Sequence, residues 1–70
     1  MINAAIIGLG WWGRYIVETL QGKSEKISFS RGIDIVPEAA ADIAEAKGLT
    51  VTADYFDALN DPSIDAVVLA

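Results

Sequence analysis

The glycine-rich segment near the start of the chain reads Gly8-Leu9-Gly10-Trp11-Trp12-Gly13. It follows Ala4–Ile7, a run that is apolar on both faces, as in a strand of a parallel sheet covered by helices. It also opens a helical pattern that we expect to run from Trp11 to Gln21. A strand, a glycine turn and a helix in this order begin a βαβ unit.

Each glycine of this segment has its own expected task. Gly8 would allow the tight turn, Gly10 would let the backbone approach a pyrophosphate, and Gly13 would let the helix pack near the strand. A diphosphate would then meet unpaired N–H groups and the positive end of the helix dipole. The spacing alone is weak evidence, because six glycines in 70 residues can produce it by chance. Its position between a strand and a helix strengthens it.

The residues between the glycines complete the expected cofactor site. Leu9, Trp11 and Trp12 belong to it, and of the two tryptophans only the backbone N–H groups are expected to take part. A large aromatic ring at the start of a packed helix is more often core or interface. Arg14 has the charge to reach a phosphate but more often lies on the solvated face of such a helix.

The rest of the chain continues the alternation of strands and helices. The sequence therefore predicts an α/β fold, a partial Rossmann domain with a doubly wound parallel sheet in the strand order 3-2-1-4. No domain boundary is expected within the chain. The remaining expected elements are a strand over Ile27–Asp34, a helix over Pro37–Lys47, a strand over Leu49–Thr52, a brief helix over Tyr55–Asn60 and a strand over Ala66–Ala70.

Side-chain periodicity predicts which residues face the core. The first helix is expected to bury residues spaced by four, namely Trp12, Ile16 and Leu20. The second helix is expected to bury Ala40, Ile43 and Ala44. Alternation along the second strand places Ile27, Phe29, Arg31 and Ile33 on one face, and Ser28, Ser30, Gly32 and Asp34 on the other.

Asp34 lies twenty-one positions beyond Gly13, at the end of the second expected strand. An acid at this distance accepts hydrogen bonds from the adenosine ribose in dinucleotide-binding folds. Gly32 would leave room for the cofactor to lie across the strand. NAD is favoured over NADP, because a carboxylate repels a 2′-phosphate and the following Ile35 cannot offset that repulsion. The alternative is that the glycines only make a turn and Asp34 only caps the helix near Pro37.

Composition excludes several other classes of site. The formal net charge is −5 with no basic run, which disfavours nucleic acid and anionic membrane surfaces. The chain has no Cys and no His, so we expect no disulfide and no zinc or other metal site. The four late aspartates, Asp54, Asp57, Asp61 and Asp65, suit a helix cap and turns. Because the N-terminus lacks the basic region of a signal peptide, we expect a soluble, cytoplasmic protein.

Three segments carry a resemblance to a known family. They are Ala5–Gly13, then Gly32-Ile33-Asp34 with Pro37–Ala40, and Asn60–Ala70, in which Asp61-Pro62 leads to Ile64-Asp65-Ala66-Val67. The chain resembles the glucose-fructose oxidoreductase / inositol dehydrogenase family, Gfo/Idh/MocA, along essentially its whole length. One departure is the second strand, where Ser28-Phe29-Ser30-Arg31 is less apolar than is usual in the family.

The resemblance implies an NAD- or NADP-dependent oxidoreductase that transfers a hydride between nicotinamide and a sugar, polyol or related alcohol. The family's Thr-Pro turn and its Glu-Lys-Pro motif with the catalytic Lys would both lie beyond Ala70, so no catalytic residue is expected in these 70 residues. A further C-terminal domain would bind the substrate, and the parent protein is expected to form a homo-oligomer. We expect residues 1–70 to be the N-terminal part of a truncated dinucleotide-binding domain, because a bare apolar edge strand such as Ala66–Ala70 invites aggregation.

Two alternatives stay open at this point. A regulatory Rossmann module that senses NAD without chemistry would show the same features, since fold and cofactor do not dictate activity. A methyltransferase that uses S-adenosylmethionine shares the glycine loop and the acid, but the G-x-G-x-x-G spacing and the segment Asp61–Ala70 weaken it. A Glu-Lys-Pro motif after a fifth strand would favour the enzyme.

Overall fold

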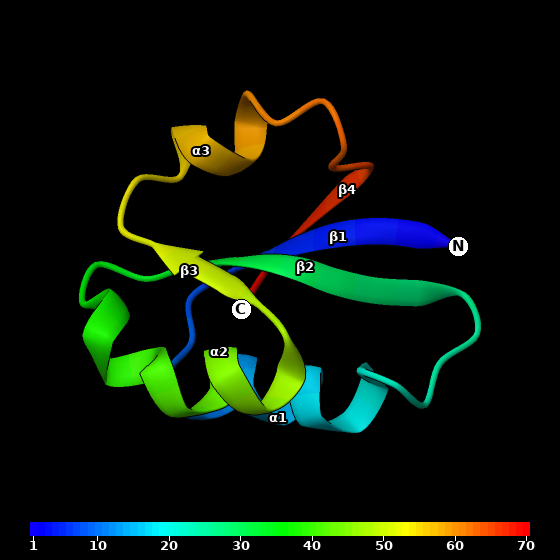
Figure 1. Cartoon of the computed structure of the whole chain (residues 1–70), viewed down its shortest axis with the longest axis horizontal. Coiled ribbons are helices and arrows are strands. Elements are labelled where there is room, and N and C mark those ends of the chain that lie inside the picture. The colour runs from blue at the N-terminus through cyan, green and yellow to red at the C-terminus, as the bar shows by residue number, and fades with distance from the viewer.

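The computed structural model describes all of residues 1–70 as four parallel strands and their connecting helices (Figure 1). The strand order is β3-β2-β1-β4, which confirms the predicted Rossmann-type sheet. Each expected strand and helix is present, with ends that differ by a few residues at most. The elements are β1 (Ile2–Ile7), α1 (Trp11–Leu20), β2 (Ile27–Ile33), the 3₁₀ helix η1 (Pro37–Ala40), α2 (Ala41–Lys47), β3 (Thr50–Thr52), α3 (Phe56–Leu59) and β4 (Ala66–Leu69).

The two faces of the sheet are covered unequally. Helices α1 and α2 lie together on one face, and the single turn of α3 lies on the other (Figure 1). The larger core cluster, on the α1 and α2 face, consists of Ala4, Ile6, Leu9, Val17, Phe29, Ala40, Ile43 and Leu49. The smaller cluster, on the α3 face, consists of Ala5, Ile33 and Ala58. Most of the buried apolar surface therefore holds α1 and α2 against the sheet.

The inner face of α1 differs from the predicted one. Gly13 and Val17 are its buried residues, with Ile16 and Leu20 packed at the margin of the core. Trp12 is 53% exposed, so the prediction that it lies in the buried stripe was wrong. The helix approaches the end of β1 so closely at Gly13 that no large ring fits beneath it.

None of the helices has the length and apolar character that a membrane crossing needs.

The second helical segment follows its predicted bounds, with one difference. Its first turn, Pro37–Ala40, is a 3₁₀ helix, and the α-helix starts at Ala41. The predicted stripe is confirmed, because Ala40 and Ile43 are buried and Ala44 packs against the same cluster. The small side chains of Ala40 and Ala44 let this helical segment lie close to the sheet.

A β-bulge interrupts β2. Ala4 is paired with Phe29 and Ala5 with Arg31, so Ser30 is the extra residue. Phe29 consequently joins the core under α1 and α2, whereas Ile33 joins the cluster on the α3 face. The prediction that Phe29 and Ile33 share a face was wrong, because strict alternation fails at an inserted residue.

The side chain of Gln21 pairs with the backbone of β2 beside the bulge. Its Nε2 donates to the Phe29 carbonyl at 2.7 Å, and its Oε1 accepts the Phe29 N–H at 2.8 Å. Strand β3 pairs only with residues 31–33 of β2, so this amide stands where a neighbouring strand would be. Nε2 also donates to the Lys47 carbonyl at 2.9 Å. Gln21 therefore joins the C-terminal ends of α1 and α2 to the sheet.

Two of the late aspartates hold turns. Asp54 Oδ1 accepts the N–H of Phe56 at 2.9 Å in the turn that leads into the short helix α3, whose N-cap position is Tyr55. Asp61 Oδ1 accepts both the N–H and the hydroxyl of Ser63, at 2.9 and 2.7 Å, within the turn before β4. These bonds with Ser63 lower the pKa of Asp61. The predicted turn is confirmed at Asp61, whereas the prediction that Asp54 caps α3 was wrong, because the helix starts one residue later than a cap at Asp54 requires.

Replacing Gln21 tests its role in holding β2. Gln21→Ala leaves the Phe29 N–H and carbonyl without partners, and a buried polar group left unpaired costs about 1–3 kcal/mol. We expect the free energy of unfolding, measured by denaturant titration, to fall by that amount. Thr19→Ala is the control, because the Thr19 hydroxyl bonds an exposed carbonyl of the same helix. Equal effects of the two substitutions would show that the bulge does not depend on Gln21.

Candidate functional site

The turn between β1 and α1 lies at the carboxyl edge of the sheet. Gly8 follows the last residue of β1, and its N–H donates to the Ile33 carbonyl at 2.8 Å. Its φ of +95° lies in the left-handed region that favours glycine. Ala70, at the end of β4, is close by, since a Cβ at Gly8 would lie 3.2 Å from the Ala70 carbonyl oxygen. Gly8 thus makes the tight turn that the sequence predicts.

Gly10 and Gly13 lack side chains for different reasons. A Cβ at Gly13 would collide with the carbonyl oxygen of Gly8, so the packing of α1 on the turn excludes any side chain there. A Cβ at Gly10 would meet no atom within 4 Å, and its φ of −73° suits any residue. Nothing within the chain requires a glycine at position 10. Close approach of a ligand to this backbone does require one.

The start of α1 presents unpaired hydrogen-bond donors. The first hydrogen bond of the helix is donated by the Arg14 N–H to the Gly10 carbonyl at 3.0 Å. The N–H groups of Trp11, Trp12 and Gly13 therefore have no partner within the helix. No side chain caps this end, and no acidic residue lies in the first turn. The end is open to an anion, which its donors and the helix dipole would both attract.

Leu9 fixes the loop by burying its side chain. It is 3% exposed and belongs to the core under α1 and α2. A Cβ at Gly32 would lie 2.6 Å from Leu9 Cδ1, so Gly32 makes room for Leu9. The expectation that Gly32 leaves space for a cofactor was therefore wrong. The N–H of Leu9 donates to Asp34 Oδ2 at 3.0 Å, which holds the loop against the end of β2.

Asp34 uses both carboxylate oxygens to hold backbone. Oδ2 accepts from Leu9, and Oδ1 accepts the N–H of Val36 at 3.0 Å. Asp34 thus joins the glycine loop to the turn that leads into η1. An ionised carboxylate has about four lone-pair positions, so each oxygen keeps capacity for a further donor. Asp34 therefore holds the turn before η1 without capping that helix, whose N-cap residue is Val36, and it keeps acceptor capacity at the carboxyl edge of the sheet.

A cleft of about 240 Å³ lies beside Asp34, outside the carboxyl ends of the first three strands. Ligands of open α/β sheets bind at this edge. Asp34 is the only charged residue in its lining, and the other residues offer mainly apolar surface. The lining consists of Ile7, Gly8, Ile33, Asp34, Ile35, Ala53 and Tyr55. Sequence reasoning did not place Ala53 and Tyr55 here, although their position just after β3 brings them to the same edge as Asp34.

Arg14 is held by an ion pair away from the loop. Its guanidinium bonds both carboxylate oxygens of Asp42, at 2.8 and 2.9 Å, and also the Ala39 carbonyl. This hydrogen-bonded pair lowers the pKa of Asp42 to about 2. Arg14 therefore joins α1 to η1 and α2.

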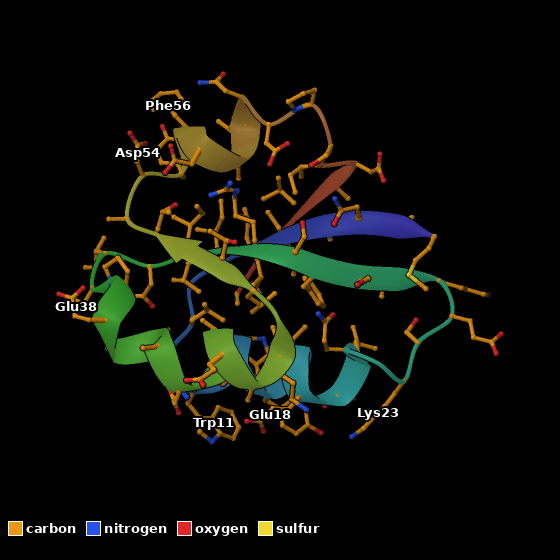
Figure 2. The ribbon with its side chains drawn as sticks, in the orientation of Figure 1. Trp11, Glu18, Lys23, Glu38, Asp54 and Phe56 are labelled. Atoms are coloured by element: carbon orange, nitrogen blue, oxygen red, sulfur yellow. The ribbon has the colours of Figure 1, made fainter.

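The two tryptophan rings lie outside the core. Trp11 is 77% exposed and Trp12 is 53% exposed. Their rings do not pack in the core, and their backbone N–H groups lie at the start of α1. Figure 2 shows Trp11 on the outer side of α1, away from the sheet.

A parallel sheet in this order, with a glycine turn after β1 and an acid after β2, defines the Rossmann class of α/β domains. Residues 2–70 match the family GFO_IDH_MocA, described as "Oxidoreductase family, NAD-binding Rossmann fold". The chain belongs to this family.

Individual relatives agree with this assignment. The inositol 2-dehydrogenase/D-chiro-inositol 3-dehydrogenase of Lactiplantibacillus plantarum is 34% identical over 68 residues, which are 94% of this chain and 19% of that protein. The myo-inositol dehydrogenase of Lactobacillus casei, solved in complex with NAD(H) and myo-inositol, has a TM-score of 0.86 at 28% identity and matches 99% of this chain and 21% of its own. An NAD-binding protein from Listeria innocua has a TM-score of 0.79 at 32% identity, over 99% and 20% of the two chains. The chain spans about a fifth of the length of these relatives.

Gly10 and Gly13 make a matched pair for substitution. Gly13→Ala forces a Cβ onto the Gly8 carbonyl, and because backbone cannot move aside we expect a loss of about 3 kcal/mol or more in unfolding free energy. Gly10→Ala meets no neighbour, so its unfolding free energy should change by about 0.5 kcal/mol at most. NAD affinity, measured by calorimetry, should nevertheless fall about tenfold or more in Gly10→Ala. Wild-type affinity in Gly10→Ala would show that no ligand approaches this backbone.

Asp34→Ala tests the choice between the two nicotinamide cofactors. Loss of hydrogen bonds to a charged group costs about 1.5–3 kcal/mol, so NAD should bind about ten- to a hundredfold more weakly. NADP should lose less, because the same substitution removes the repulsion of its 2′-phosphate. Calorimetric titration of each cofactor measures both effects, with Asp57→Ala as a control that removes an exposed carboxylate. If wild type binds both cofactors equally, or if the loss is the same for both, Asp34 serves only the backbone.

Proposed function

We propose that residues 1–70 are the N-terminal, cofactor-binding part of a longer NAD-dependent oxidoreductase that acts on a polyol. The observation that carries the proposal is the open approach to Gly10, beside unpaired N–H groups of α1 and the acceptor Asp34. These three features lie at the one edge of the sheet where the cleft is found.

The loop and Asp34 divide the recognition of NAD between them. The N–H groups of Trp11, Trp12 and Gly13 bind the diphosphate, and the bare backbone of Gly10 lets it approach. Gly8 and Leu9 hold the loop in its shape. The free lone pairs of Asp34 accept hydrogen bonds from the ribose, and the apolar lining of the cleft receives the adenine. When bound, the nicotinamide supplies the hydride chemistry.

Charge at this edge favours NAD over NADP. Asp34 is the charged group of the cleft, and the nearest arginines are both engaged with acids. Arg14 bonds Asp42, and Arg31 Nε lies 3.6 Å from Asp61. No free cation is therefore placed to accept a 2′-phosphate.

The substrate class rests on the relatives, which are inositol dehydrogenases. The chain's own lysines do not serve the reaction centre: Lys23 and Lys26 lie in the loop between α1 and β2, and Lys47 lies at the end of α2. Lys23 and Lys26 follow the C-terminal end of α1, whereas the glycine loop lies at its N-terminal end, and Figure 2 shows Lys23 at the far end of α1 from that loop. With no His or Cys present either, the catalytic groups and the polyol site belong to the rest of the protein.

Titration and turnover of the complete protein test the proposal. We expect NAD to bind more tightly than NADP, and NAD to be reduced when an inositol isomer or a related polyol is added, as followed by the absorbance of NADH. Gly10→Ala, which keeps the fold, should bind NAD about tenfold or more weakly than the wild type. Binding of NAD without reduction by any polyol would favour an NAD-sensing module, and absence of NAD binding would overturn the proposal as a whole.

A further inference from the structure

Three aromatic rings form an exposed cluster on α1. Trp11, Trp12 and Tyr15 stack on one another, with ring centroids 5.8, 6.0 and 5.5 Å apart. Their exposed fractions are 77%, 53% and 52%, and none of them belongs to either core cluster. Grouped large apolar side chains on a surface mark a site of interaction more often than single ones do.

The cluster lies at the end of α1 that the proposed cofactor site uses. Trp11 and Trp12 directly follow Gly10, and their N–H groups are among the proposed diphosphate donors. Ala70 lies at the same helix end, since its Cβ would be 3.4 Å from a Cβ at Gly13. Residues that follow Ala70 thus start beside the first turn of α1. Given relatives about five times as long, most of the complete protein is available to reach this surface.

The charges around the cluster narrow the choice of partner. The nearest cation, Arg14, is paired with both oxygens of Asp42, so no free cation accompanies the rings. Single-stranded nucleic acid needs cations together with stacking rings, and an anionic membrane needs them too. A second copy would bring another chain segment with a net charge of −5. A segment of the same chain loses no translational entropy on docking.

We propose that the Trp11–Trp12–Tyr15 cluster is the surface on which a later segment of the same chain packs, so that this segment also covers the diphosphate end of the cofactor site. The inference rests on the proposed function, because that proposal makes residues 1–70 part of a longer chain. Tryptophan and tyrosine are the residues that contribute most at such contacts. The later segment would then pack on Trp11 and Trp12, the same residues whose backbone N–H groups are proposed to bind NAD.

Hydroxyl-radical footprinting of the complete protein, read by mass spectrometry, tests the burial of the rings. Without NAD, we expect Trp11, Trp12 and Tyr15 to be oxidised several-fold more slowly than in the unfolded protein, at every protein concentration. Oxidation as fast as in the unfolded protein would overturn the inference. Protection that disappears on dilution would also overturn it, because a second copy would then be the partner.

A substitution outside the proposed cofactor site gives a second readout. Tyr15→Glu places a charge in the cluster, so it should raise the oxidation of Trp11 and Trp12 in the folded protein and lower the melting temperature, whereas Glu45→Gln on α2 should do neither. Unchanged protection in Tyr15→Glu would count against the docking surface. NAD titration of the same wild-type protein keeps the two proposals apart: exposed rings with normal NAD binding overturn the docking surface alone, and protected rings without NAD binding overturn the cofactor site alone.

Discussion

The contact between Gly13 and the carbonyl of Gly8 governs the geometry of this domain. It brings the first turn of α1 directly over the end of β1, a distance that only a residue without a side chain permits. The unpaired N–H groups of the helix consequently lie at the carboxyl edge of the sheet, beside Asp34 and the cleft. Gly13 thus takes the inner position of the first turn, and the neighbouring Trp12 is 53% exposed.

The buried side chains that hold the glycine loop in place lie on one face of the sheet. Leu9, from the loop, and Phe29, from β2, share the core under α1 and α2. The bulge at Ser30 makes this possible, since it places Phe29 on that face while Ile33 lines the cleft. Gln21 pairs with the backbone beside the bulge, where β3 does not reach. The side-chain amide of Gln21 thus makes the hydrogen bonds to Phe29 that a neighbouring strand would otherwise make.

Local patterns in the sequence predicted the strand order, the glycine turn and the position of Asp34, because each depends on residues close together in the chain. The errors have a different origin. The bulge at Ser30 depends on the pairing of β2 with β1, and the face that α1 buries depends on how closely Gly13 approaches Gly8, and periodicity carries no record of either. Gly32 was assigned to a ligand because its neighbour across the sheet, Leu9, could not be known. The binding roles of Gly8–Gly13 and of Asp34 remain predictions, as does the extent of the domain beyond Ala70.

Under the proposed function, the hydrogen bond from Leu9 to Asp34 has a consequence for any attempt to change the bound cofactor. An engineer who replaces the acid to admit a 2′-phosphate also removes the acceptor that fixes the second residue of the glycine loop. Under that proposal, the choice between NAD and NADP and the position of the glycine loop depend on the same side chain. A successful redesign has to supply a neutral acceptor, such as a serine or threonine hydroxyl, within reach of the Leu9 N–H.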